Sequence, residues 1–178
     1  FFNSVSGDRK YKAEDWASYF ASFIGNGVFP LPSTGLQVVA GNGMQVTVKA
    51  GKAWINGYFY NNTSDLSLTL ATADGVLNRI DRVVVRWDLT NRLISVKVKS
   101  SSPSASPTAP NIERDADIYE LALADIYIGA GVTSITGSKI TDKRLDTSVC
   151  GVVAAVVDQI DTEAFNAQLE AWFTEYQS

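Results

Sequence analysis

Apolar side chains first recur at a helical spacing between Lys12 and Ile24. The residues that would share one face of this helix are Trp16, Tyr19, Phe20, Phe23 and Ile24. Glu14 and Asp15 fall in the first turn, where the helix dipole favours negative charge. A helix that is apolar on one face normally packs that face on the core, so we expect an N-terminal core helix. An aromatic box that binds a ligand is the less favoured alternative.

The period changes to two between Leu36 and Lys99, as in strands that bury one face. Asn56-Gly57 stands between two such runs, and this pair favours the tight turn of a β-hairpin. Thr90-Asn91 predicts a second turn of this kind, and Gly41-Asn42-Gly43 a third. The alternating residues include Met44, Val46 and Val48; Leu66, Leu68 and Leu70; Val83, Val85 and Trp87; and Ile94, Val96 and Val98. A run of antiparallel hairpins predicts a mainly β fold, either a sandwich or a small barrel.

The stretch from Ser100 to Pro110 is rich in serine and proline and predicts a long, semi-extended loop. Ile118 to Ile128 is apolar in both phases of a two-residue period. We expect a strand that is buried on both faces, with a short helix as the alternative.

The last segment, residues 152–178, contains no glycine or proline and carries two apolar stripes. It predicts a long C-terminal helix with more apolar surface than one contact covers, which favours packing against other copies of the chain. The domain organisation expected is a β-rich platform over residues 1–151 and an oligomerisation helix over residues 152–178, and we expect the natural chain to extend at both ends. The residues expected at the oligomer interface are Ile160, Phe165, Leu169, Trp172, Phe173 and Tyr176.

Composition excludes several classes of function. The 178 residues include no histidine, which excludes Ser-His-Asp and Cys-His catalysis and histidine-based zinc sites. The single cysteine, Cys150, is expected to be a small buried residue. The net charge of −4 argues against nucleic acid as a partner. No run approaches the ~20 apolar residues that span a bilayer. We expect no cofactor, no metal ion and no enzymatic activity.

Three groups of residues are candidates for binding. The charges Arg79, Asp81, Arg82, Arg86 and Asp88 surround one strand, and form either ion pairs across a subunit contact or a solvated strand face. Asp142, Arg144 and Asp146 predict a turn with an internal ion pair in preference to a calcium site. Trp54, Tyr58 and Tyr60 flank the Asn56-Gly57 turn; core or interface packing is favoured for them, and stacking on sugar rings is the alternative.

Several segments, in this order along the chain, carry a family resemblance. They are Ser6-Gly7-Asp8-Arg9-Lys10-Tyr11, Asn26-Gly27-Val28-Phe29-Pro30, Gly51-Lys52-Ala53-Trp54-Ile55-Asn56-Gly57-Tyr58, Ala73-Asp74-Gly75, residues 79–88, Tyr119-Glu120-Leu121-Ala122-Leu123-Ala124, residues 140–146 and Cys150-Gly151. The series covers nearly the whole chain. It resembles the N-terminal region of minor tail structural proteins of phages and prophages of Gram-positive bacteria, a group that overlaps with baseplate and receptor-binding proteins.

The resemblance implies a structural protein of the virion, made in the host cytoplasm and located at the tail tip. It implies a homotrimer, so that the expected C-terminal helices would form a bundle of three. The implied partners are other tail or baseplate proteins, and host cell-wall polysaccharide through domains further downstream. The alternative function is a carbohydrate-binding module that contacts the cell-wall glycan directly.

Overall fold

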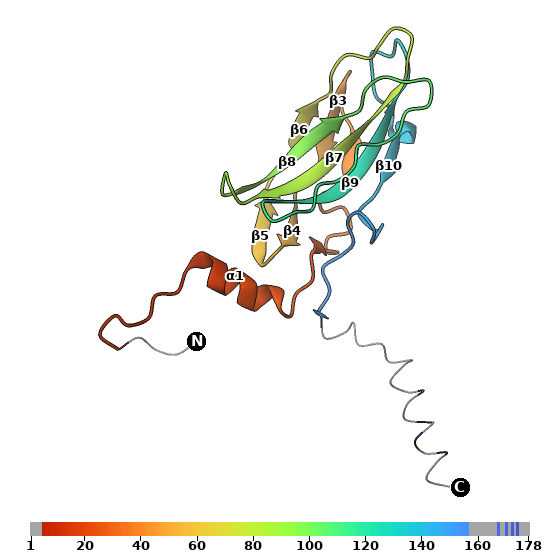
Figure 1. Ribbon diagram of the computed structural model, residues 1–178. Coiled ribbons are helices and arrows are strands. Elements are labelled where there is room, and N and C mark those ends of the chain that lie inside the picture. Colours follow the sequence, from red (N-terminus) through yellow and green to blue (C-terminus); the bar gives the residue numbers. More distant parts are fainter. Residues whose placement is uncertain (1–4, 157–166, 168–169, 171, 173, 175–178) are drawn as a thin grey trace.

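The computed structural model describes residues 5–156 together with Ala167, Glu170, Trp172 and Thr174 (Figure 1). The first elements are helix α1 (Ala13–Ala21) and strands β1 (Gly27–Val28), β2 (Val38–Ala40), β3 (Gln45–Val48), β4 (Gly51–Ile55), β5 (Tyr58–Asn62) and β6 (Leu66–Thr69). Strands β7 (Arg79–Asp88), β8 (Leu93–Ser100), β9 (Ile118–Ile128) and β10 (Ile140–Asp142) follow, with the 3-10 helix η1 (Gly137–Lys139) before β10.

The strands form three antiparallel sheets in the orders β1-β4-β5, β2-β3-β6 and β10-β9-β7-β8. In Figure 1 the four-stranded sheet lies in front of β3 and β6, and the apolar core fills the space between the layers. The core takes one phase of each alternating strand, as Val46 and Val48 of β3 and Val83 and Val85 of β7 illustrate. The predicted hairpin turn at Asn56-Gly57 is confirmed, with positive φ angles of 51° and 83°.

Strand β9 changes phase half-way along its length. Its pairing with β7 is shifted between Val83 and Val84, so that one extra residue of β9 fits opposite β7 as a bulge. Leu121 before the bulge, the extra residue Leu123 itself, and Ala124 and Ile126 after it therefore all reach the same core. Glu120 and Ala122, on the opposite face, are also fully buried, so this part of β9 is buried on both faces as predicted.

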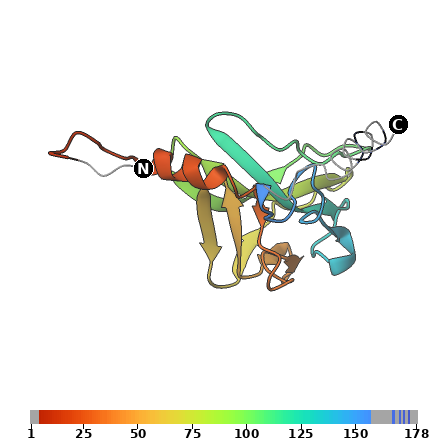
Figure 2. The ribbon, with the colours of Figure 1, turned by 90° about the horizontal axis from the view of Figure 1, so that it is seen from below.

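Helix α1 lies where the sequence predicts a helix, but its aromatic face is not part of the core. Its first turn is closed by the Asp15 carboxylate, which accepts a hydrogen bond from the Lys12 backbone N–H at 2.7 Å. Only Ala17 is buried. It rests on the β4–β5 turn so closely that a Cβ on Gly57 would collide with the Ala17 backbone. Figure 2, which views the molecule from below, shows α1 beside the ends of β4 and β5. The expectation of a core helix is wrong because the small Ala17, and not the aromatic stripe, makes the contact.

The fold class expected from the sequence is also wrong at the other end of the chain. Within residues 5–156 the structure is mainly β, with α1 as its one α-helix, and no long C-terminal helix is defined. Residues 152–155, expected to begin that helix, are extended and form isolated bridges to Val28 and Ile24. The Val153 N–H donates to Val28 O at 2.9 Å, and the Gly25 N–H to Ala154 O at 2.9 Å. β-Branched valines favour extended backbone, and these bonds hold it so.

Candidate functional site

The candidate functional site is a group of partly exposed aromatic side chains on α1 and on the β4–β5 hairpin, here called the aromatic surface. Trp16 is 46% exposed, Tyr19 49% and Phe59 51%. The members are Trp16, Tyr19, Phe20, Phe23, Phe29, Trp54 and Phe59. Side chains from three parts of the sequence thus form one surface.

The rings of the aromatic surface contact one another in a continuous chain. On α1, the Trp16 and Phe20 centroids lie 6.5 Å apart. The Tyr19 ring of α1 lies 4.8 Å from that of Phe23, just beyond the helix, with the rings perpendicular. Phe20 joins the helix to β4 through Trp54, at 6.2 Å. Edge-to-face aromatic pairs at such distances contribute roughly 0.5–1.5 kcal/mol beyond their burial, so the surface is held in a defined shape.

A surface of this composition is suited to binding another protein. Soluble monomers rarely expose large contiguous apolar patches, and such patches mark interaction sites. Tryptophan and tyrosine are also the residues that most often dominate the binding energy of protein interfaces. The Lys52 ammonium lies 6.0 Å from the centroid of the Phe59 ring. The side chains that make up this surface are all aromatic.

The three residues considered for sugar stacking are divided between two sides of the hairpin. Trp54 pairs across the strands with Phe59 and belongs to the aromatic surface. Its indole N–H is buried and forms no hydrogen bond with the described residues. Tyr58 and Tyr60 point the other way, pack against the core and line a cleft. Burial raises the pKa of both phenols above the ordinary value of 10.0.

The predicted oligomer interface lies almost entirely outside the described residues. Ile160, Phe165, Leu169, Phe173 and Tyr176 are not described. Trp172 is described and is 56% exposed.

The charges around β7 are engaged within the chain, so neither predicted role applies to them. The Arg82 guanidinium binds the Asp125 carboxylate of β9 through two bonds of 2.6 and 2.8 Å, and a third bond of 2.8 Å reaches Pro110 O. Arg79, on the same strand, binds the fully buried Asp81 at 3.1 Å. Desolvation raises the pKa of Asp81, and the Arg79 hydrogen bond opposes this shift. The solvated strand face and the subunit contact are both replaced by internal ion pairs.

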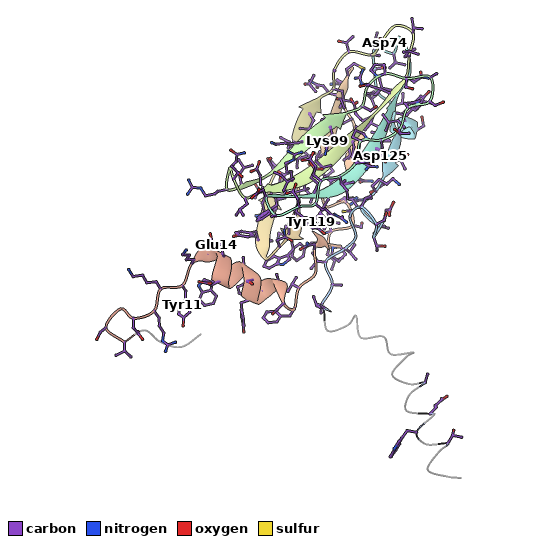
Figure 3. All side chains as sticks on the ribbon, in the orientation of Figure 1. Tyr11, Glu14, Asp74, Lys99, Tyr119 and Asp125 are labelled. Carbon is purple, nitrogen blue, oxygen red and sulfur yellow. The ribbon has the colours of Figure 1, made fainter. Side chains whose placement is uncertain are left out.

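Glu120 is the centre of a second group of ion pairs on the outer face of the four-stranded sheet. Its fully buried carboxylate accepts from Arg86 Nε at 2.8 Å and from Lys99 Nζ at 2.8 Å. The backbone N–H of Glu113 donates to it as well, at 2.8 Å. Figure 3 shows Lys99 and Asp125 on this sheet. Because Pro110 and Glu113 belong to the loop after β8, these bonds fasten residues 101–117 to the sheet.

The predicted ion pair at Asp142 and Arg144 is confirmed. The Arg144 guanidinium binds Asp142 at 2.6 Å and also donates to Ser33 O and Gly35 O, each at 2.8 Å. Asp146 instead accepts from Lys143 at 3.1 Å. Among the described residues no group of three or more acidic or cysteine side chains is placed to hold a metal ion.

Cys150 is buried, as predicted from the sequence. Burial raises the pKa of its thiol from 9.0 to about 12, so the thiolate that would act as a nucleophile is scarce at neutral pH.

Sequence reasoning missed the exposure of the aromatic stripe and two charged residues of the cleft, Glu14 and Arg92. The exposure of the stripe depends on tertiary packing, which the spacing of apolar residues does not report. For Arg92 the sequence contained one local signal, the tight turn predicted after β7, in which Arg92 has a positive φ.

No protein-family model, no curated protein and no solved structure matches this chain. In the described part of the chain, no helix combines the length and the apolar character needed to cross a membrane.

Proposed function

We propose that this chain is a non-enzymatic structural module of a bacteriophage tail tip, the platform of a receptor-binding or baseplate protein used in host adsorption. The proposal begins from the ordered series of segments that resembles minor tail structural proteins. The aromatic surface is the structural observation that carries it, because an exposed surface of this kind suits a protein whose task is assembly.

The internal ion pairs support a role as a rigid platform. A module that transmits force between tail proteins needs loops that keep their place. The loop over residues 101–117 is fastened to the sheet by Arg82, Arg86 and Lys99. The charges of the four-stranded sheet named above are paired within the chain, so the aromatic side chains are the better candidates for contacts with another protein.

We infer that copies of this chain meet through the aromatic surface, as a homotrimer. The chain enters the β body through α1, and residue 156 is bonded just beyond this helix, since the Val156 N–H donates to Phe23 O at 3.0 Å. Contact between copies through the aromatic surface would therefore bring together the chain segments that precede α1 and those that follow residue 156. A cyclic trimer closes the assembly with one repeated contact.

Immunogold electron microscopy tests the location. Antibodies raised against the purified chain are applied to phage particles released from the bacterium that encodes it, with antibody pre-absorbed on the chain as the control. Gold at the tail tip is the expected result. Intact, tailed particles that contain no label, while the cell extract does contain the chain, contradict the proposal.

A further inference from the structure

A cleft separate from the main aromatic surface opens between α1 and the β7–β8 turn. The first turn of α1, strand β5, the end of β7 and the start of β8 line it. Its volume is about 350 Å³, within the ~300–1,000 Å³ of typical small-molecule sites. Phe59 is the one residue that it shares with the aromatic surface.

Aromatic rings form the inner wall of the cleft. Tyr58 and Tyr60 come from one face of β5, and Trp87 comes from the adjoining end of β7. The Tyr58 and Trp87 centroids lie 5.7 Å apart, with the ring planes tilted by 42°. At neutral pH both phenols are protonated, so their hydroxyl groups can donate hydrogen bonds to a ligand.

The rim carries one charge of each sign. Glu14 lies in the first turn of α1 (Figure 3), close enough for its charge to raise the Tyr58 pKa. Arg92 stands on the opposite rim, in the β7–β8 turn. Among the described residues, neither Glu14 nor Arg92 has an ion-pair partner. The two side chains therefore keep their hydrogen-bonding groups for a ligand.

Arg92 is held at the rim by a strained turn. Its φ is +53°, in the left-handed region that an arginine enters only at an energetic cost and that glycine adopts freely. The turn is fixed by Asp88, whose carboxylate accepts from Asn91 N at 2.8 Å and from Asn91 Nδ2 at 2.9 Å. Strain of this kind gathers at functional sites.

We propose that this cleft binds one pyranose ring of a neutral polysaccharide. The C–H face of the sugar would lie against Tyr58 and Tyr60, an apolar surface with polar edges. Arg92 would donate to a pair of neighbouring hydroxyl groups, and Glu14 would accept from hydroxyl groups at the other rim. Because one rim carries an acidic side chain and the other a basic one, a neutral ligand is favoured. A phosphate or carboxylate would be repelled by the negative charge of Glu14.

This inference goes beyond the proposed function, because it gives the chain a ligand of its own. It explains why Tyr58 and Tyr60, but not Trp54, would contact sugar. The chain could bind a glycan even if immunogold labelling does not find it at the tail tip, and a tail-tip protein could fail to bind a glycan. The outcomes of the two tests are therefore independent.

Isothermal titration calorimetry with chitohexaose, maltohexaose and cellohexaose tests the proposal on the unaltered chain. We expect saturable binding of at least one of the three. Arg92→Ala and Glu14→Gln should each weaken it about ten-fold or more. Lys10→Ala and Asp117→Asn, which change exposed charges outside the cleft, are the matched controls and should leave the affinity unchanged.

Arg92→Gly separates binding from folding. It removes the strain at the positive φ, so the melting temperature should rise while the sugar affinity falls. No saturable heat from any of the three oligosaccharides at millimolar concentration overturns the proposal. Binding that survives both Arg92→Ala and Glu14→Gln overturns it too, because the sugar would then lie elsewhere.

Discussion

Glu120 is the residue whose charge matters most to the outer face of the sheet. It is fully buried, and its two oxygens accept from Arg86, Lys99 and the Glu113 backbone. Breaking a buried ion pair by removing one partner costs about 3–5 kcal/mol, because the remaining charge is left uncompensated. We expect Glu120→Gln to lower the free energy of unfolding by roughly 3 kcal/mol in urea titrations.

Glu113→Gln is the matched control, since Glu113 binds the same two cations but is 46% exposed at the side chain. Exposed pairs contribute about 0–1 kcal/mol, so this variant should lose less than about 1 kcal/mol. Equal losses for the two variants would show that burial of Glu120 does not determine its contribution.

At the scale of elements, α1 depends on its contact with the β4–β5 turn. Gly57 has a φ of +83°, and a Cβ there would collide with the backbone of Ala17. Gly57→Ala should therefore release α1 from the hairpin. Hydrogen exchange followed by mass spectrometry should show faster exchange over residues 13–21, while the β-sheets keep their protection.

Gly131→Ala controls for the strain of a side chain at positive φ. Gly131 has a φ of +67°, and a Cβ there would meet no atom within 4 Å. It should destabilise the fold only through backbone strain, of about 1 kcal/mol, and leave exchange in α1 unchanged. Faster exchange of α1 in both variants would argue that the contact at Gly57 does not hold the helix.

The elements that sequence predicts well here are those with local signals. Asn56-Gly57 specifies its own turn, and the alternation of Val83, Val85 and Trp87 predicts which face of β7 contacts the apolar core. The extended backbone at 152–155 and the bulge in β9 depend on neighbours distant in sequence. The spacing of apolar residues along the chain contains no information about such neighbours. The candidate sites follow the same rule. The aromatic stripe of α1 can be identified from the sequence. Its exposure cannot, because it depends on the contact of Ala17 with the β4–β5 turn.

For the molecule as a whole, the carboxylates that hold loops determine the acid stability. Hydrogen bonds from Leu77 and Val76 lower the pKa of Asp74, and those from Ile118 and Asp117 lower that of Asp115. A folded-state pKa below the ordinary 3.8 contributes stability that is complete above that value and is lost as the pH falls through the lowered pKa. The stability measured by circular dichroism in an acid titration should therefore begin to fall only once the pH drops below the ordinary carboxyl values, 4.5 for Glu113 and 3.8 for Asp74 and Asp115.

Asp115→Asn removes this dependence at one site. The pH-dependent part of its unfolding curve should be shallower than that of the unaltered chain, because one fewer carboxylate is protonated on unfolding. An unchanged slope would indicate that the Asp115 pKa is not lowered in the folded protein. Asp117→Asn, at the neighbouring exposed position, is the control.

Assembly is the property of the whole molecule on which the proposed function depends. One chain has a mass of 19.2 kDa, and sedimentation equilibrium should give three times this mass for the unaltered chain. Trp16→Ser combined with Phe59→Ser removes one exposed ring from each of two parts of the aromatic surface, and should shift the mass toward one chain. Val76→Ser combined with Leu145→Ser is the matched control, since these side chains are 83% and 80% exposed and lie outside that surface. If only the loss of exposed apolar area mattered, both double variants would lower the mass alike. If the contact is specific, only Trp16→Ser with Phe59→Ser lowers it. An unaltered chain that sediments as a monomer at millimolar concentration would refute self-association through the aromatic surface, and that surface would then need a different protein to cover it.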